Sequence, residues 1–348
     1  MSFPAPSSVR AWPALFEVLA LSLLGGLLAM LLAAAFGVRL SNPFATLQPG
    51  ALPGSWLPLA QSVGQVLFFQ YAGIALLVAA IWWPRGDLRQ RRLGLGCNGQ
   101  RALPLLKLGL MAACLLAPWH LGLLLADAQW DLGPTEPWRQ ALLDAPQTWD
   151  FWVLMAVASY GLVPVLEELF YRGVLQGRLQ QVMPPGLAIL LSSLLFALSH
   201  SQYHQPNLLN LGTFVFLLAT ALVLGGLYWR TGSLWPGMLA HGVINLPAQN
   251  GSLGLLVIAL MLGLAWWGRR LIGELVTELL GALRPRQIGK AAPAMALATV
   301  TFAILSTLAA ELALLLALAL LPVALGLDWW LRRSHQGSRA KAPEQAGR

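Results

Sequence analysis

The sequence predicts an all-α fold, a polytopic transmembrane bundle of about eight or nine helices. Hydrophobic residues make up 57% of the 348-residue chain and charged residues only 10%, whereas soluble domains carry about a quarter charged residues. Many of the apolar residues form runs of about 20, the length that crosses a bilayer. The 15 tryptophans are typical of a protein with aromatic anchors at the membrane–water interfaces. A soluble helical protein would leave several of these runs without a water-facing side.

Nine apolar runs follow one another along the chain. We interpret the first as a retained membrane helix, because no cleavage site of small residues follows it. The second ends in two tryptophans and a proline, an interfacial anchor before a helix-stopping residue. An acidic segment, residues 127–150, follows the third run and is expected to form an external loop or interfacial helix. The runs cover residues 14–38, 57–83, 103–126, 151–182, 186–200, 211–229, 234–247, 253–267 and 293–327.

The chain shows no internal repeat and no change of composition that would mark a domain boundary. We expect one membrane domain over residues 1–330, its functional core at about 151–250, and a disordered basic tail at 331–348. Cys97 lies in a basic loop and Cys114 in an apolar run, so a disulfide between them is not expected.

The placement of the basic residues predicts the location and the partners of the protein. The net charge of +8 could suggest nucleic acid, but basic residues gather in short segments between apolar runs, as the positive-inside rule expects. Segments 85–101 and 269–290 are therefore expected on the cytoplasmic side. We expect a multi-pass protein of the bacterial inner membrane with membrane lipid as a partner and no nucleic acid.

The fourth run contains ionisable residues in its middle. A charge at the centre of a membrane helix costs about 2.5–3.5 kcal/mol on insertion scales, so such residues mark functional sites by default. Glu168 and Arg172 lie four residues apart and can pair on one helix face. Glu167 points about 100° away and faces another partner. One carboxylate held ionised and a second tuned by burial would suit general-base catalysis, but the residues could also form a structural Glu–Arg link between helices.

Two further runs carry histidine. The fifth ends in Phe196-Ala197-Leu198-Ser199-His200, and a single histidine at a helix end is more often a cap than a catalyst. His204 could share a metal with His200 only if the helix continued, which the following Gln-Pro disfavours. The seventh run places His241 and Asn245 on one helix face. They could bind a metal, donate to an oxyanion or hold two membrane helices together.

A break separates the sixth run from the seventh. Gly232 is expected to end one helix, Ser233 to cap the next, and Pro236 to occupy its first turn. If the polar faces of the fourth, fifth and seventh runs converge, they form a polar chamber in which a water molecule could be activated.

The ordered trio Glu167-Glu168-x-x-x-Arg172, Phe196-x-x-x-His200 and His241-x-x-x-Asn245 resembles the three-motif signature of the CPBP family, the CAAX prenyl endopeptidase and bacteriocin-processing intramembrane proteases. Residues 228–237 also resemble that family, and the resemblance covers about residues 151–247. It implies an all-helical membrane fold and hydrolysis of a peptide bond, often near the C-terminus of a membrane-anchored peptide or protein. The implied roles are water activation by Glu167, water binding or polarisation by His200, oxyanion stabilisation by His241 and Asn245, and organisation of the site by Glu168 and Arg172.

The resemblance leaves the cofactor open, because the family includes proteins described as metalloproteases and as glutamate-type proteases without a metal. The chain lacks His-Glu-x-x-His, but Glu167, His200 and His241 could ligate zinc. In a bacterium the substrate need not be prenylated and could be a membrane-anchored precursor, a peptide or a C-terminal sorting tail.

Two other functions compete with proteolysis. Glu, His and Arg within a membrane also build the proton relays of transporters, but no repeat or second set of broken helices supports a transporter. A catalytically silent scaffold or immunity-type protein of the same fold is the other alternative. The filling of every motif position argues against it.

Overall fold

The protein is described from a computed structural model. The structure describes residues 8–84, 93–96, 102–134, 136–203, 206–246, 252–284, 322–323 and 325–326. The described part is helical, apart from an isolated β-bridge between Gln48 and Ala51. Five of its helices are long and apolar enough to cross a membrane, and a sixth span arises if one bent helix pair is counted. The predicted all-α membrane bundle is confirmed. Some sequence predictions concern residues outside the described part of the chain: Cys97, His204, most of run 293–327 and the tail at 331–348.

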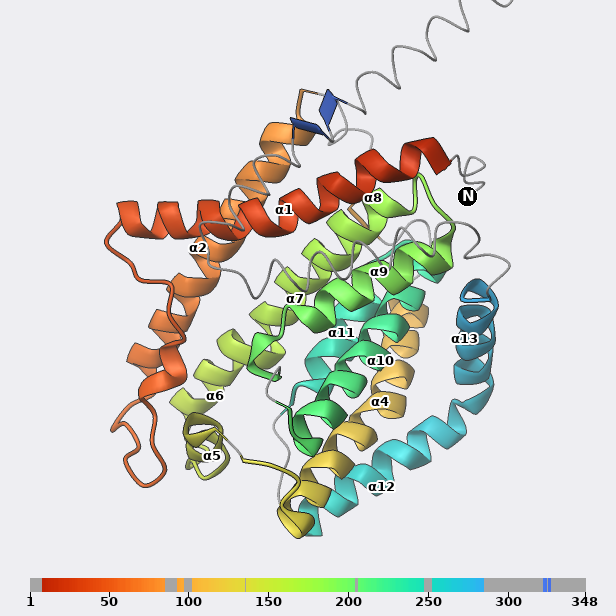
Figure 1. Ribbon diagram of the computed structural model, residues 1–348. Helices are drawn as coiled ribbons and strands as arrows, with labels where there is room; N and C mark the ends of the chain where they lie inside the picture. Colours follow the sequence, from red (N-terminus) through yellow and green to blue (C-terminus); the bar gives the residue numbers. More distant parts are fainter. Residues whose placement is uncertain are drawn as a thin grey trace, which may run out of the picture.

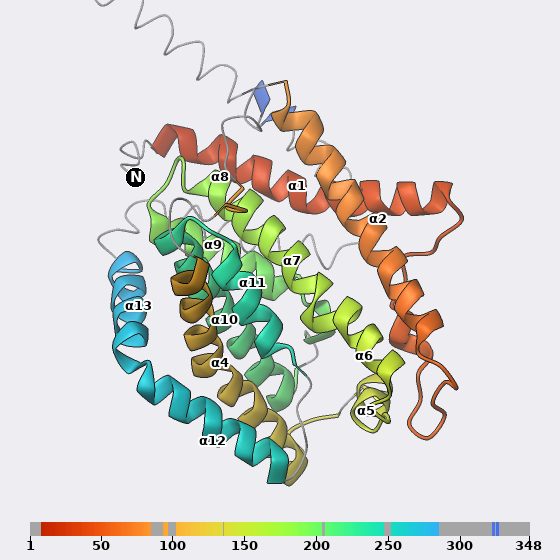
Figure 2. The same ribbon diagram turned by 180° about the vertical axis from the view of Figure 1, so that it is seen from behind.

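The first two apolar runs form α1 (Ser8–Ala35) and α2 (Leu57–Trp82), joined through η1 (Pro43–Thr46). The helices cross each other in both views (Figures 1 and 2). Glycine permits the close crossing: a Cβ on Gly73 would lie 2.5 Å from the backbone nitrogen of Ala29, and one on Gly25 would lie 2.7 Å from Ile74 Cγ1. Small residues commonly mark such contacts between membrane helices.

The fourth run is one candidate span, Trp149–Leu179, made of five segments. Two of them, η2 and η3, are π-helical, which the prediction of a single apolar element did not include. Pro164 explains one irregularity, because it lacks the N–H that would bond the carbonyl of Tyr160. Gly242 of α11 approaches that carbonyl, and a Cβ there would lie 2.6 Å from it. The segments are α6 (Trp149–Met155), η2 (Ala156–Tyr160), α7 (Leu162–Glu168), η3 (Leu169–Gln176) and α8 (Gly177–Leu179).

The remaining helices surround this span. Helices α9, α10 and α11 lie against one side of it, and α4, α12 and α13 form the layer beyond (Figures 1 and 2). The acidic segment after α4 contains the short helix α5, in agreement with the expected loop or interfacial helix. Their bounds are α4 (Ala102–Trp130), α5 (Pro137–Leu143), α9 (Pro185–Leu198), η4 (Ser201–Tyr203), α10 (Leu208–Thr231), α11 (Trp235–Ile244), α12 (Ser252–Trp267) and α13 (Arg269–Ala282).

The basic segment after α12 begins with α13, which bends away from α12 by 77°. Leu275, Leu279 and Ala282 recur at helical spacing on α13 and are buried. Arg230 at the end of α10 reaches Glu274 and Glu278 on this helix, at 3.1 and 3.3 Å. The sequence predicted only a basic cytoplasmic segment here, and no helix.

A buried charge pair that the sequence analysis missed joins α1 to α8. Arg178 Nη2 and Nε both lie 3.0 Å from Glu17 Oε2, and Trp82 Nε1 donates to Glu17 Oε1 at 2.7 Å. We call Glu17, Trp82 and Arg178 the α1 clamp. Glu17 and Arg178 are 161 residues apart, so no local spacing pointed to them.

Candidate active site

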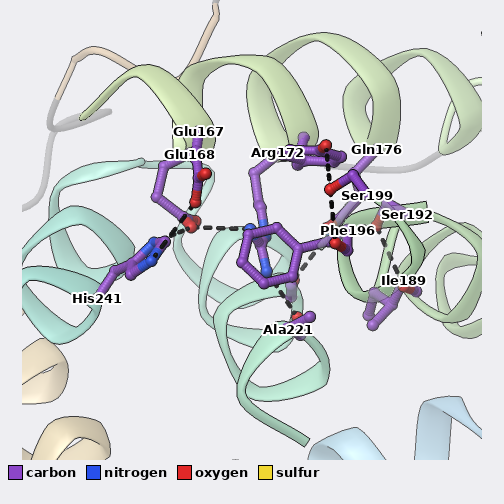
Figure 3. A network of polar contacts seen from close by, with 12 residues as sticks. Glu167, Glu168, Arg172, Gln176, Ile189, Ser192, Phe196, Ser199, Ala221 and His241 are labelled. Atoms are coloured by element: carbon purple, nitrogen blue, oxygen red, sulfur yellow. Dashed lines mark hydrogen bonds and ion pairs between the residues drawn. The ribbon is translucent and has the colours of Figure 1, made fainter. Parts of the chain in front are cut away.

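The span Trp149–Leu179 carries the predicted ion pair. Arg172 Nη1 lies 2.8 Å from Glu168 Oε1, and both side chains are 1% exposed. Arg172 Nη2 also donates to the carbonyl oxygen of Ala221 on α10, at 3.1 Å (Figure 3). The pair straddles the change from α7 to the π-helical η3. π-Helical turns are frequent at functional sites.

His241 on α11 lies between the two adjacent glutamates (Figure 3). Its Nδ1 is 3.1 Å from Glu168 Oε1, and its Nε2 is 3.6 Å from Glu167 Oε2. The imidazole is buried, with 5% of its side chain exposed. The structure thus brings the first and third motifs together through a single ring.

The two glutamates occupy different environments. Glu168 is sealed at 1% exposure, whereas Glu167 is 17% exposed. The second carboxylate oxygen of Glu168, Oε2, is buried and has no hydrogen-bond partner among the described residues. A Cβ on Gly237 would lie 2.9 Å from this oxygen, so a larger residue where α11 passes it would require Glu168 or α11 to shift. Of the pair, Glu167 is the carboxylate that a reactant can reach.

Phe196 places the second motif beside the first and third. Its buried ring lies under the Arg172 guanidinium at 4.8 Å, and its centroid is 5.8 Å from that of His241 and 4.7 Å from that of His200. His200 Nδ1 lies 2.8 Å from the carbonyl oxygen of Phe196. The two imidazoles therefore contact the same phenyl ring. Phe196 belongs to the second motif, but the sequence predicted no role for it.

The structure does not place Asn245 among these contacts. Its Nδ2 donates to the carbonyl oxygen of Ser159 at 3.1 Å, and Ser159 Oγ donates to the carbonyl oxygen of Asn245 at 3.3 Å. These reciprocal bonds tie the end of α11 to η2. The predicted oxyanion role of Asn245 stays a prediction.

The predicted break before α11 is present. Gly232 ends α10 with a φ of 63°, and Pro236 lies in the first turn of α11. Ser233 accepts from the Trp235 backbone N–H at 3.4 Å, although the residue at the helix boundary is Leu234. After Ser199 the chain turns into η4, so α9 does not continue towards His204.

The donors do not fit a metal in this arrangement. Within the described part of the chain, no three His, Cys, Asp or Glu side chains are grouped so that they could hold an ion. Glu167, His200 and His241, the predicted zinc ligands, are therefore not assembled as a ligand set.

A second polar group lies one turn beyond Arg172. Gln176 Nε2 donates to the carbonyl oxygen of Gly225 at 2.8 Å, and Ser192 Oγ donates to Gln176 Oε1 at 3.4 Å. Tyr171 donates to Ser199 Oγ at 2.7 Å. Gln176 and Ser192 were not predicted from the sequence, although Glu168, Arg172 and Gln176 recur at four-residue spacing. The hydrogen bonds of Tyr171 and Gln176 connect the span Trp149–Leu179 to the α9 end and to α10.

A protein-family model supports the resemblance. Residues 148–247 match the family described as type II CAAX prenyl endopeptidase Rce1-like. The matched segment holds all three motifs, so the resemblance to CAAX-type intramembrane proteases is confirmed for this part of the chain. No curated protein and no solved structure matches the chain.

Proposed function

We propose that the protein is an intramembrane endopeptidase that hydrolyses a peptide bond of a membrane-associated peptide or protein, near the C-terminus of that substrate. The observation that carries the proposal is the pair of adjacent glutamates in unequal environments, joined by His241. A membrane-associated substrate is expected because Glu167 and Glu168 lie on a helical span, Trp149–Leu179, that is long and apolar enough to cross a bilayer. The family match to CAAX prenyl endopeptidases supports the reaction class.

Hydrogen bonding assigns one proton in the site. Arg172 can only donate, so Glu168 Oε1 accepts from it, and the tautomer of His241 that completes this contact carries its proton on Nδ1. His241 Nε2 then faces Glu167 Oε2 at 3.6 Å with a lone pair, so a proton taken up by Glu167 can pass to the ring. Glu167 and His241 thus form an acid–base pair whose orientation Glu168 fixes.

The reaction then needs one water molecule. Glu167 accepts a proton from the water as its oxygen bonds to the substrate carbonyl carbon, and the π electrons of the carbonyl become an oxyanion. When the carbonyl re-forms, the C–N bond breaks and the leaving nitrogen takes a proton from the Glu167–His241 pair. Each proton removed from the water is returned to a product.

His200 is suited to hold the same water. A carbonyl oxygen can only accept, so His200 donates from Nδ1 to Phe196, and in the neutral ring Nε2 keeps a lone pair. That lone pair can accept the second hydrogen of the water while Glu167 accepts the first. His200 and His241 both contact the Phe196 ring.

The test compares Glu167→Gln with Glu274→Gln, a control on the exposed side of α13. Purified protein in phospholipid vesicles is given a farnesylated peptide ending in Cys-aliphatic-aliphatic-X. In parallel, the C-terminal peptides of host membranes are compared between wild-type and Glu167→Gln copies. Removing a general base lowers rates about 10²–10⁴-fold, so new C-termini should disappear with Glu167→Gln alone. Normal cleavage by that variant would refute the assignment.

A further inference from the structure

Helix α2 lies outside the segment that matches the protease family, but it runs beside the span Trp149–Leu179, which carries the two glutamates (Figures 1 and 2). The two helices start together, because the Trp56 backbone N–H and the Ser55 hydroxyl both donate to Asp150 Oδ2, at 2.9 and 3.0 Å. They remain in contact further along, where a Cβ on Gly64 would lie 3.8 Å from Val157 Cγ1. The helices therefore run in the same direction from a common level.

This register brings Tyr71 to the level of the glutamates. Tyr71 lies seven residues after Gly64, two helical turns, and so occupies the same face of α2. At about 1.5 Å per residue it is about 10 Å beyond Gly64, while Glu167 is about 15 Å beyond Val157. The two residues are thus within about one helical turn of each other along parallel helices.

The side chain of Tyr71 packs against the buried cluster that contains Tyr171 and Phe196. It is close enough to Glu167 and Glu168 for their charges to act on its hydroxyl. Whereas Tyr171 donates to Ser199, the Tyr71 hydroxyl makes no hydrogen bond to any described residue. Tyr71 is half-buried as a residue, and its hydroxyl keeps a donor that no described residue uses.

The proposed reaction needs such a donor. Both ring nitrogens of His241 face carboxylates, and the Asn245 amide donates to Ser159. The two residues expected from the sequence to stabilise the oxyanion are therefore engaged elsewhere. A donor aimed at the position where negative charge develops is commonly the largest electrostatic contribution to catalysis of acyl transfer.

We propose that Tyr71 is a catalytic residue that donates a hydrogen bond from its hydroxyl to the oxyanion of the tetrahedral intermediate. The proton stays on the phenol throughout, so this contact adds no step to the reaction. The inference rests on the proposed function, and it extends the site to a helix that the family match does not include.

The kinetic test uses Tyr71→Phe, with Tyr228→Phe as control, since the Tyr228 hydroxyl lies against Gly177 of α8. Losing one oxyanion donor lowers kcat about 10²–10³-fold, and KM and the unfolding temperature in detergent should stay near wild type. Unchanged kcat in Tyr71→Phe overturns the inference. If Glu167→Gln is inactive while Tyr71→Phe is fully active, only this inference fails. If Glu167→Gln is active, the proposed function fails first.

A cross-linking test examines the juxtaposition without activity. In a background carrying Cys97→Ser and Cys114→Ala, Tyr71→Cys is combined with Glu167→Cys and treated in membranes with a short bifunctional thiol reagent, because a direct disulfide is too short to span two side chains that flank a substrate carbonyl. The control combines Glu167→Cys with Phe69→Cys, because Phe69 packs against Phe36 on another face of α2. Only the Tyr71 pair should cross-link. Absence of that cross-link, or equal cross-linking of both pairs, overturns the inference.

Discussion

Two buried Glu–Arg pairs use the same residue types for different ends. In the α1 clamp both oxygens of Glu17 are bonded, one by Trp82 and the other by Arg178. In the site, Glu168 Oε1 is shared by Arg172 and His241, while Oε2 has no hydrogen-bond partner among the described residues. A carboxylate satisfied on both oxygens holds helices together. The site pair instead positions an imidazole next to the partly exposed Glu167, the residue that acts as general base in the proposed mechanism.

The largest expected effect separates the two pairs by activity. His241→Ala removes the ring that joins Glu168 to Glu167 and should lower kcat about 10²–10⁴-fold in the vesicle assay. The control is His120→Ala, whose ring stacks on Phe216 at 4.9 Å. A His241→Ala enzyme that retains wild-type kcat would remove the acid–base pair from the mechanism.

Stability should respond similarly at the two pairs. Arg172→Met strands Glu168 and Arg178→Met strands Glu17, and each should lower the free energy of unfolding by about 3–5 kcal/mol, measured in mixed detergent micelles. Replacing both partners leaves no buried charge alone and should restore most of that stability.

Activity of the double variants then distinguishes the pairs. Glu17→Leu with Arg178→Met should cleave at the wild-type rate, whereas Glu168→Leu with Arg172→Met should be stable and inactive. An active second variant would show that the site pair is also structural. An inactive but folded first variant would give the α1 clamp a catalytic influence.

A smaller effect is expected within the α1 clamp. Trp82→Phe removes the 2.7 Å hydrogen bond to Glu17 Oε1 and should lower the free energy of unfolding by about 1.5–3 kcal/mol, since the acceptor is charged. Cleavage by the folded fraction should not change. Trp83→Phe is the matched control, because Trp83 is 69% exposed. Equal losses in both variants would contradict a specific bond to Glu17.

The smallest effect concerns the helix that passes Glu168. Gly237→Ala places a methyl group 2.9 Å from Glu168 Oε2 and should destabilise the protein by about 1–3 kcal/mol through overpacking. Gly273→Ala in α13 meets no atom within 4 Å and should leave stability unchanged or raise it by up to about 1 kcal/mol. Thermal unfolding of both variants in detergent measures the difference. Similar values would mean that Glu168 can shift without strain.

The parts that local spacing determines could be predicted from the sequence. Helix geometry places residues four apart on one face, so the Glu168–Arg172 pair was expected before any coordinates. The break at Gly232 and the proline in the first turn of α11 also follow from backbone preferences of single residues. The apolar runs predicted the helices because a bilayer excludes an unpaired backbone.

Only the tertiary structure decided which distant residues meet. His241 contacts glutamates more than 70 positions earlier, and Asn245 bonds Ser159 instead of facing the glutamates. The irregular backbone at Tyr160, at the end of η2, likewise depends on Pro164 and on the close approach of α11. Helical periodicity sets which face of its own helix a residue occupies, whereas helix crossing and register depend on packing between segments that no local pattern connects.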